Sequence, residues 1–266
     1  MTLPSLASFW HGGPLAAIEM ASLHSFVALG HPVTVYSHAP IANLPGAVEW
    51  RDADEILPTD KVAVHRKHGS SALHSNFFRY AMFRKTEHLW VDLDIVALRP
   101  LAFEGGHVFG YETPASVNGA VLRLPKDSPA LELLSRLGPH TRGVAPHIKG
   151  LRRLKYWVRT FGRGYPIDEW VWGSAGPRAL TTYLTQTGEI RHARPVEAFY
   201  PIGVNEHQRL LEPGLTPESF GPETYAVHLW ASRLRKTLAE RHGGAIPPDS
   251  FTGRVVERAR KDGFDA

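Results

Sequence analysis

The chain has 266 residues, of which 43% are hydrophobic and 21% are charged, as is ordinary for a soluble globular protein. It contains no cysteine, which excludes disulfides and thiolate metal sites, and no apolar run of about 18 residues, so we expect no transmembrane helix. The formal net charge of +4 is compatible with a nucleic acid, an anionic lipid or a phosphorylated substrate as partner. Because no nucleic-acid-binding motif is present, we predict no nucleic-acid partner.

The first part of the chain predicts a strand–helix–strand unit. Residues 6–10 are typical of a strand, and residues 33–36 of a second one. Between them, apolar residues recur at helical spacing up to Gly30, and we expect Pro14 at the first helical position. The unit is about as long as a right-handed βαβ crossover.

Further elements alternate along the chain. Apolar or β-branched runs predict strands at residues 48–51, 88–96, 108–112, 119–124 and 225–230. Helical spacing and capping residues predict helices at residues 71–85, 128–137 and 177–187, and one after residue 248. Strands that alternate with helices favour an α/β fold with a mostly parallel central sheet, whose ligands bind beyond the carboxyl ends of the strands.

Residues 138–166 are rich in glycine, proline and arginine and show no firm periodicity, which favours a mobile segment that could order over a bound ligand. Within it, residues 147–157 are strongly basic. Two interpretations remain open for this stretch: a solvated helix face or flap, or a patch that contacts a membrane or an anionic acceptor.

The strongest chemical signal is the pair Asp92 and Asp94 in the apolar run HLWVDLDIV at residues 88–96. In a strand, residues two apart point to the same side, so both carboxylates would lie on one face about 6–7 Å apart. Two like charges in an apolar strand are costly unless a cation neutralises them. Mg²⁺ or Mn²⁺ fits, since both prefer oxygen ligands and could bridge the carboxylates to a diphosphate.

Two other functions are compatible with parts of the sequence: a phosphatase and a carbohydrate-binding module without catalysis. The pattern D-L-D-I-V at residues 92–96 also matches the nucleophile motif of haloacid-dehalogenase-type phosphatases, with Asp92 as the nucleophile. That family places the motif near the N-terminus and needs a later acidic pair, which we do not find. The other rival is a carbohydrate-binding module without catalysis, against which the paired aspartates argue.

Residues 75–80 (SNFFRY) and 90–101 (WVDLDIVALRPL) resemble the DXD-containing glycosyltransferase family 32, which comprises α-1,4-glycosyltransferases and initiating mannosyltransferases. The family order is also followed by FWHGG at 9–13, NGA at 118–120, GSAGP at 173–177, FYPI at 199–202 and AVHLW at 226–230. The resemblance implies a GT-A (Rossmann-like) fold. It also implies metal-dependent, retaining transfer of a sugar from a nucleotide sugar to a hydroxyl of a glycan or glycolipid precursor.

The resemblance assigns roles to residues outside the DXD pair. It implies that His228 is the third metal ligand beside Asp92 and Asp94, and that Arg79 binds the diphosphate or fixes the DXD loop. The other residues that it places at the nucleotide sugar are Phe9, Trp10, Gly12, Asn76, Asp92 and Asn118.

Two positions depart from the family pattern. Asn76 stands where the family has an aspartate that helps to hold the nucleoside, so this position bears on the choice of base. The donor that we expect is a UDP-sugar. Residues 86–88 (TEH) replace a Gly-Gly pair before the DXD motif.

The catalytic group is expected among Asp168 and Glu169, which precede the Gly-Pro helix start at residue 176. Retention implies either attack on the same face of the sugar or a carboxylate nucleophile, and an acidic pair could serve either route.

We expect one GT-A domain over residues 1–266, with a donor-binding half at about 1–125 and an acceptor-side portion at about 126–266. The N-terminal residues lack the pattern of a signal peptide, so we expect a cytoplasmic protein, with peripheral contact at the inner face of the membrane as a further expectation.

Overall fold

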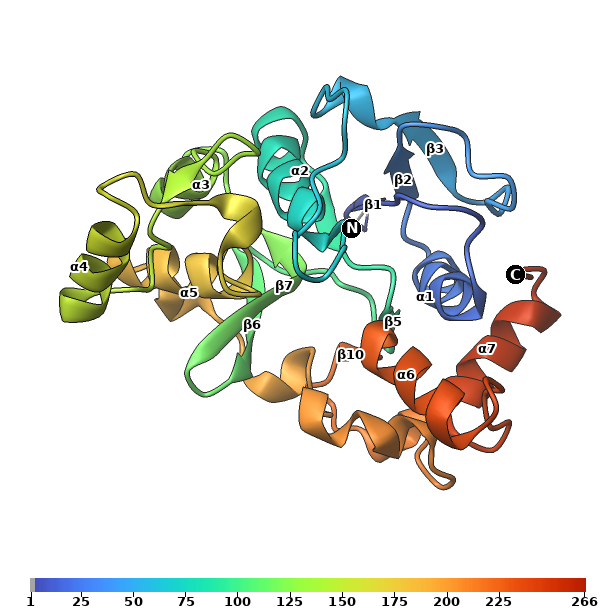
Figure 1. Cartoon of the computed structure of the whole chain (residues 1–266). Helices are drawn as coiled ribbons and strands as arrows, with labels where there is room; N and C mark the ends of the chain where they lie inside the picture. The colour runs from blue at the N-terminus through green and yellow to red at the C-terminus, as the bar shows by residue number, and fades with distance from the viewer. Residues whose placement is uncertain (1–2) are drawn as a thin grey trace.

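A computed structural model describes residues 3–266 and shows an α/β fold in three layers (Figure 1). A six-stranded sheet has the order β3-β2-β1-β4-β7-β6, in which β7 alone runs against the others. This mostly parallel sheet confirms the predicted fold class and is consistent with a GT-A (Rossmann-like) arrangement. Its strands are β1 (Leu6–Phe9), β2 (Val33–Ser37), β3 (Glu49–Asp52), β4 (Leu89–Val91), β6 (Val108–Thr113) and β7 (Ser116–Arg123).

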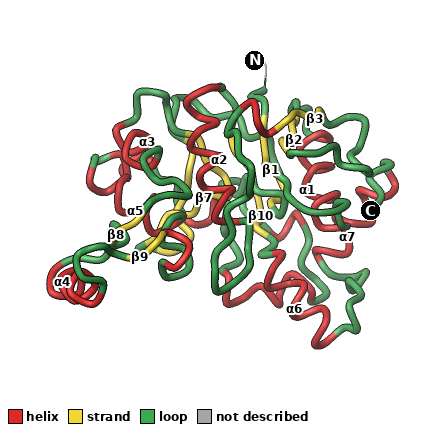
Figure 2. The backbone as a smooth tube through the Cα atoms, turned by 45° about the horizontal axis from the view of Figure 1, so that its top comes forward, coloured by secondary structure: helices red, strands yellow, loops and turns green. Residues whose placement is uncertain are grey.

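Helices cover both faces of the sheet, as Figure 2 shows from a second direction. One face carries α1 (Ala17–Ala28), α6 (Ala231–Arg241) and α7 (Phe251–Lys261). The opposite face carries α2 (Ala72–Lys85), α3 (Pro129–Leu134) and α5 (Pro177–Gln186). The helix α6 is missing from the sequence-based assignment, because its only buried residues are Ala231, Leu234, Thr237 and Leu238 and most of its surface is polar.

The buried apolar residues form two hydrophobic cores, one on each face of the sheet. Both arise because side chains alternate between the two faces along a buried strand. In β4, Leu89 and Val91 pack into the core beside α1, while Trp90 between them packs into the core beside α2. Both faces of the sheet are covered, so its inner strands β1, β2 and β4 are buried on both sides. This explains why β4 is a continuous hydrophobic run rather than an alternating one.

Three sequence-based expectations need correction. The helix α1 begins at Ala17, so Pro14 lies in the preceding loop and not at the first helical position. The predicted strand 88–96 is two strands, β4 and β5 (Ile95–Ala97), and β5 leaves the sheet to pair with β10 (Ala226–His228). Residues 138–166 contain regular structure: β8 (Arg142–Gly143), α4 (Gly150–Arg159) and β9 (Tyr165–Pro166), of which the two strands pair with each other.

The remaining regular segments are short 3₁₀ helices. They are η1 (Ala53–Glu55), η2 (Ile167–Glu169), η3 (Glu189–His192), η4 (Val196–Ala198), η5 (Val204–Leu211) and η6 (Pro217–Ser219). Among the helices of residues 3–266, none is both long and apolar enough to cross a membrane.

Glu189 is a buried carboxylate that ties η3 to the start of α3. It accepts hydrogen bonds from the backbone N of Ala130 (2.7 Å), the Thr187 hydroxyl (2.7 Å) and His107 Nε2 (2.9 Å). Burial by itself would raise the pKa of Glu189, but hydrogen bonds from Ser128, His107, Thr187 and Ala130 lower it from 4.5 to about 2. Its ionised form therefore stabilises the fold.

We expect Glu189→Gln to lower the free energy of unfolding at pH 7 by about 2–4 kcal/mol. Because the folded-state pKa is depressed, this contribution is complete above about pH 4.5 and is lost as the pH falls toward about 2. Urea unfolding should therefore show a difference in unfolding free energy between the wild type and Glu189→Gln that is smaller at pH 2.5 than at pH 7. Glu132→Gln on the exposed side of α3 is the matched control. An equal difference at both pH values would contradict the prediction.

Candidate functional site

Two cavities meet beyond the carboxyl ends of β1 and β4, where ligands bind in parallel α/β sheets. The larger has a volume of about 300 Å³ and extends toward α5 and the segment before it. The smaller, of about 290 Å³, extends toward the loop after β1 and the start of α6. Both cavities are lined by Ala72, Arg79, Asp92, Asp94 and Ser232. The two aspartates therefore stand at the junction of the two cavities.

Asp92 and Asp94 occupy a turn between β4 and β5, so the expectation that they share one face of a strand is wrong. The backbone N of Asp92 still bonds the carbonyl of Ala120 (2.7 Å), which extends the pairing of β4 with β7. The chain then turns, and Ile95 N bonds the carbonyl of Asp92 (3.2 Å). The turn, and not strand alternation, brings both carboxylates to the cavities.

Asp92 is held by two donors that reach the same carboxylate oxygen. Trp90 Nε1 donates to Asp92 Oδ1 at 2.6 Å, and Arg79 Nη2 donates to it at 3.2 Å. Arg79 is only 6% exposed, stacks over the Trp90 ring at 4.6 Å and also donates to the carbonyl of Gly119. A Cβ at Gly119 would come within 2.7 Å of Arg79 Nη1, so any side chain there would displace the guanidinium from its present position. Arg79 thus holds the Asp92 carboxylate in this structure, and its role toward a bound diphosphate stays a prediction.

Asp94 links β10 to the start of α6. Asp94 Oδ1 lies 3.1 Å from His228 Nε2, and Asp94 Oδ2 accepts from the backbone N of Ala231 at 2.9 Å. The bond to Ala231 forms because Trp230 takes a left-handed conformation (φ 56°), which turns the chain out of β10 into the helix. Strain of this kind is often found at functional sites.

The two partners shift each other's pKa. Burial by itself would lower the pKa of His228, but the charge of Asp94 and the hydrogen bond to it raise that pKa above its ordinary value. Burial would likewise raise the pKa of Asp94, but the charge and hydrogen bond of His228 and the bond from Ala231 N lower it. The pair is therefore stabilised in its charged form.

The donor set at the junction suits a hard divalent cation. Asp92, Asp94 and His228 offer carboxylate oxygens and an imidazole nitrogen, the ligand types that Mn²⁺ and Mg²⁺ sites use. His228 Nδ1 is buried and has no hydrogen-bond partner among the described residues. Within residues 3–266, the three side chains do not all converge to within 4.8 Å of one another. Their role as metal ligands stays a prediction.

The residues predicted at the nucleotide sugar divide between the two cavities. Phe9 and Trp10 line the smaller one; Phe9 also stacks on Phe78 with ring centroids 4.8 Å apart. Asn76 and Asn118 line the larger one. Asn118 is fixed by a bond to Glu112 (2.9 Å) and by the backbone N of Ala120 (2.9 Å).

Gly12 lies in the loop between β1 and α1. It lies outside the linings of both cavities and ahead of α1, which begins at Ala17. Its φ of +147° is one that residues with a side chain rarely adopt. Gly12 lies in a bend after Trp10, and its contact with the nucleotide sugar stays a prediction.

Asp168 and Glu169 are not brought to the junction. Both carboxylates pair with Arg66: Asp168 Oδ2 lies 3.4 Å from Arg66 Nε, and Glu169 contacts the same guanidinium. Neither residue lines the two cavities that contain Asp92 and Asp94, and Glu169 lines a separate cavity beside α4. The arrangement does not favour their predicted catalytic role, which stays a prediction.

Two polar residues of the larger cavity were not predicted. His65 is 6% exposed and its Nε2 bonds the Trp170 carbonyl (2.8 Å), while its Nδ1 has no hydrogen-bond partner in the described chain. Ser174 is 1% exposed and its hydroxyl is likewise unpartnered there. These buried polar atoms are suited to bind hydroxyl groups of a ligand. Ser174 lies in the GSAGP stretch of the resemblance, but no pattern in the sequence marks His65.

An ion pair between a buried carboxylate and a half-exposed guanidinium beside the smaller cavity was also not predicted. Glu19 of α1 is 2% exposed and pairs with Arg235 of α6, and both side chains line this cavity. The residues lie 216 positions apart in the chain, so sequence spacing carried no signal for the contact.

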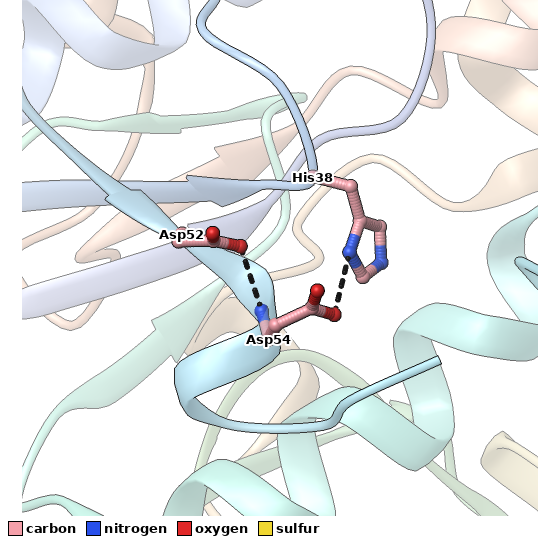
Figure 3. A group of neighbouring side chains, drawn as sticks. All are labelled: His38, Asp52 and Asp54. Carbon is pink, nitrogen blue, oxygen red and sulfur yellow. Dashed lines mark hydrogen bonds and ion pairs between the residues drawn. The ribbon is translucent and has the colours of Figure 1, made fainter. Parts of the chain in front are cut away.

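A second acidic group, His38, Asp52 and Asp54, lies at the edge of the sheet and has its ligand atoms within 4.8 Å (Figure 3). Its contacts have a local structural explanation. Asp52 caps η1 by accepting from the backbone N of Asp54 at 2.9 Å, and His38 Nδ1 pairs with Asp54 at 3.0 Å. We therefore assign this group to the capping of η1.

The protein has an α/β fold, and its two cavities meet beyond the carboxyl end of β4. No family model matches the chain. It is similar to lactosylceramide 4-alpha-galactosyltransferase from Pan troglodytes and from Homo sapiens, each 24% identical over 226 residues that cover 80% of this chain and 52% of the relative. The enzyme of the same name from Pongo pygmaeus is 25% identical over 80% of this chain and 85% of the relative.

The chain spans about half the length of the first two relatives. At this level of identity, the similarity supports a distant relationship to glycosyltransferases, and it gives no support to the phosphatase alternative.

Proposed function

We propose that the protein is a metal-dependent, retaining glycosyltransferase that moves a sugar from a nucleotide sugar to a hydroxyl of a glycan or glycolipid acceptor. The observation that carries the proposal is the meeting of two cavities at Asp92 and Asp94, beyond the carboxyl end of β4. The distant similarity to α-galactosyltransferases supports the same class of reaction. Two joined cavities suit a reaction with two substrates.

The proposed arrangement puts the nucleotide in the smaller cavity. Phe9 and Trp10 offer aromatic surface for a base, and Arg235 offers a guanidinium to phosphate oxygens. The transferred sugar and the acceptor take the larger cavity, where Asn76, Asn118, His65 and Ser174 offer hydrogen bonds to hydroxyl groups. The diphosphate then lies at the junction, beside the two aspartates.

Asp92, Asp94 and His228 would hold the Mn²⁺ or Mg²⁺ ion. When bound, such an ion stabilises the negative charge of the leaving nucleoside diphosphate. Arg79 positions Asp92 through its hydrogen bond, and the backbone N of Ala231 positions Asp94. These contacts reduce the freedom of both carboxylates before any ligand binds, which lowers the entropy lost on binding.

The larger cavity favours same-face attack over a carboxylate nucleophile. Among the described residues, the carboxylates in its lining are Asp92 and Asp94, which the proposal assigns to the metal. Asn118 and Asn76 remain as uncharged side chains beside the sugar. They can orient the donor hydroxyls but cannot form a glycosyl ester.

The test is donor hydrolysis and transfer across a panel of UDP-, GDP- and CMP-sugars, with lactose and lactosylceramide as trial acceptors. We expect release of one nucleoside diphosphate that stops with EDTA and returns with Mn²⁺. Metal-dependent cleavage of a phosphomonoester with a phosphate trapped on Asp92 would instead establish the phosphatase. Sugar binding without turnover of any donor would favour a carbohydrate-binding module.

A further inference from the structure

The helix α4 turns an apolar stripe away from the rest of the protein. Leu151, Leu154 and Val158 follow each other at spacings of three and four and therefore share one face of the helix. Their exposed fractions are 85%, 58% and 67%, and Phe161 just after the helix is 94% exposed. Both Figure 1 and Figure 2 show α4 projecting at the periphery of the fold. Exposed apolar side chains gathered in this way mark an interaction site.

Phe161, at the C-terminal end of α4, is exposed and has a strained backbone conformation. Phe161 has a φ of 50°, a conformation that is unfavourable for a bulky side chain. The backbone N of Gly162 bonds the carbonyl of Trp157 at 2.8 Å, which closes the helix and leaves Phe161 at its tip. Phe161 therefore extends the exposed apolar surface of α4 beyond the end of the helix.

The same segment carries a concentrated positive charge. Residues 133–167 contain eight Lys or Arg residues and no Asp or Glu, whereas the whole chain has a net charge of +4, so the rest of the chain is net negative. Arg152, Lys155 and Arg159 form a basic stripe beside the apolar one. Among the described residues, none of these three forms an ion pair with a carboxylate.

The arm that carries α4 is anchored close to the larger cavity. Its base is the pairing of β8 with β9, and Tyr156 packs on Tyr165 with ring centroids 5.7 Å apart. The chain continues from β9 directly to Ile167, Val171 and Trp172, which line the larger cavity. Whatever surface holds α4 therefore lies near the mouth of that cavity.

We propose that α4 and Phe161 dock the protein on an anionic lipid bilayer, with the apolar stripe in the boundary between headgroups and acyl chains. A helix with an apolar face and basic residues beside it fits this environment, because long basic side chains can extend to the lipid phosphates while their stems stay on the apolar side. Nucleic acid would match the charge but would leave the apolar stripe in water. The proposal involves no donor and no metal, so it stands apart from the proposed transferase activity.

The test is co-sedimentation of the full chain with phosphatidylcholine vesicles that contain or lack phosphatidylglycerol, without donor or metal. We expect binding to the anionic vesicles only, and weaker binding at high salt. Replacing Leu151, Leu154 and Val158 with Gln, which keeps helix propensity, should weaken binding by about tenfold or more. Replacing Arg152, Lys155 and Arg159 with Gln should have an effect of similar size.

A charge-matched control removes three exposed arginines from another basic helix: Arg254, Arg258 and Arg260 of α7, each replaced with Gln. This variant should bind anionic vesicles like the wild type. Thermal unfolding of every variant checks the fold, which should be unchanged because the replaced side chains are exposed.

The proposal is overturned if the wild-type chain does not bind anionic vesicles, or if either α4 variant binds them as well as the wild type. It is also overturned if the α7 variant loses as much vesicle binding as the α4 variants. It is also overturned if the chain forms a dimer in solution that the apolar variant abolishes, because the stripe would then be an interface between copies. Donor hydrolysis is measured without vesicles, so the transferase proposal can fail or succeed independently.

Discussion

Asp94→Asn is expected to reduce metal-dependent donor turnover by on the order of 10³-fold, since a bound cation contributes several kcal/mol to transition-state stabilisation. The substitution removes the negative charge that faces His228 Nε2 at 3.1 Å. It keeps an oxygen that can still accept from the backbone N of Ala231, so the start of α6 remains capped. Turnover and the dissociation constant for Mn²⁺ are the two measurements.

The matched control for this prediction is Asp265→Asn, a carboxylate-to-amide change at an exposed residue near the C-terminus. It should leave turnover and Mn²⁺ affinity unchanged. An Asp94→Asn protein that still binds Mn²⁺ as tightly as the wild type would refute the assignment of Asp94 as a ligand. Loss of turnover with an unfolded protein would point to the contacts with His228 and Ala231 instead, and urea unfolding separates these outcomes.

Arg79→Lys is expected to lower the free energy of unfolding by about 1–3 kcal/mol and to weaken turnover by at least about tenfold. The guanidinium of Arg79 joins Gly119, Asp92 and Ser75, and it also stacks on Trp90. Lysine keeps the charge, but its single ammonium cannot reach all these acceptors from one position. Asp92 then loses a fixed orientation.

The control is Arg84→Lys on the same helix, α2, where the exposed arginine donates only to the carbonyl of Lys126 among the described residues. It should change stability by less than about 0.5 kcal/mol. If Arg79→Lys is as stable and as active as Arg84→Lys, the geometry of the guanidinium is not needed and Arg79 acts through charge alone.

The elements with a strong hydrophobic period could be predicted from local sequence. The strands β1 and β2, the helices α2 and α5 and the cap of α3 at Ser128 lie where the pattern indicates. The helix α4 was not assigned a range, because its apolar residues are separated by basic ones in a segment rich in glycine and proline. A core-facing stripe and a solvent-facing stripe have the same spacing in a sequence, and only packing distinguishes them.

The positions of Asp92 and Asp94 show how much of the site could be predicted from the sequence. Their apolar surroundings indicated a buried run that ends in charge, and the structure has this. The turn between them could not be deduced, because β5 leaves the sheet to pair with β10, which lies more than a hundred positions later. Asp168 and Glu169 were selected by their place in the chain, and Arg66 turns out to pair with both.

Local pattern alone was enough to indicate an α/β fold, the apolar lead into the two aspartates and the basic character of residues 147–157, because each depends on neighbours within a few positions. Contacts across the chain were decided only by the tertiary structure. Asp94 and His228 lie 134 positions apart, and Glu19 and Arg235 lie 216 apart. Burial removes water from these groups and makes a specific partner necessary, but the choice of partner depends on how the helices pack against the sheet.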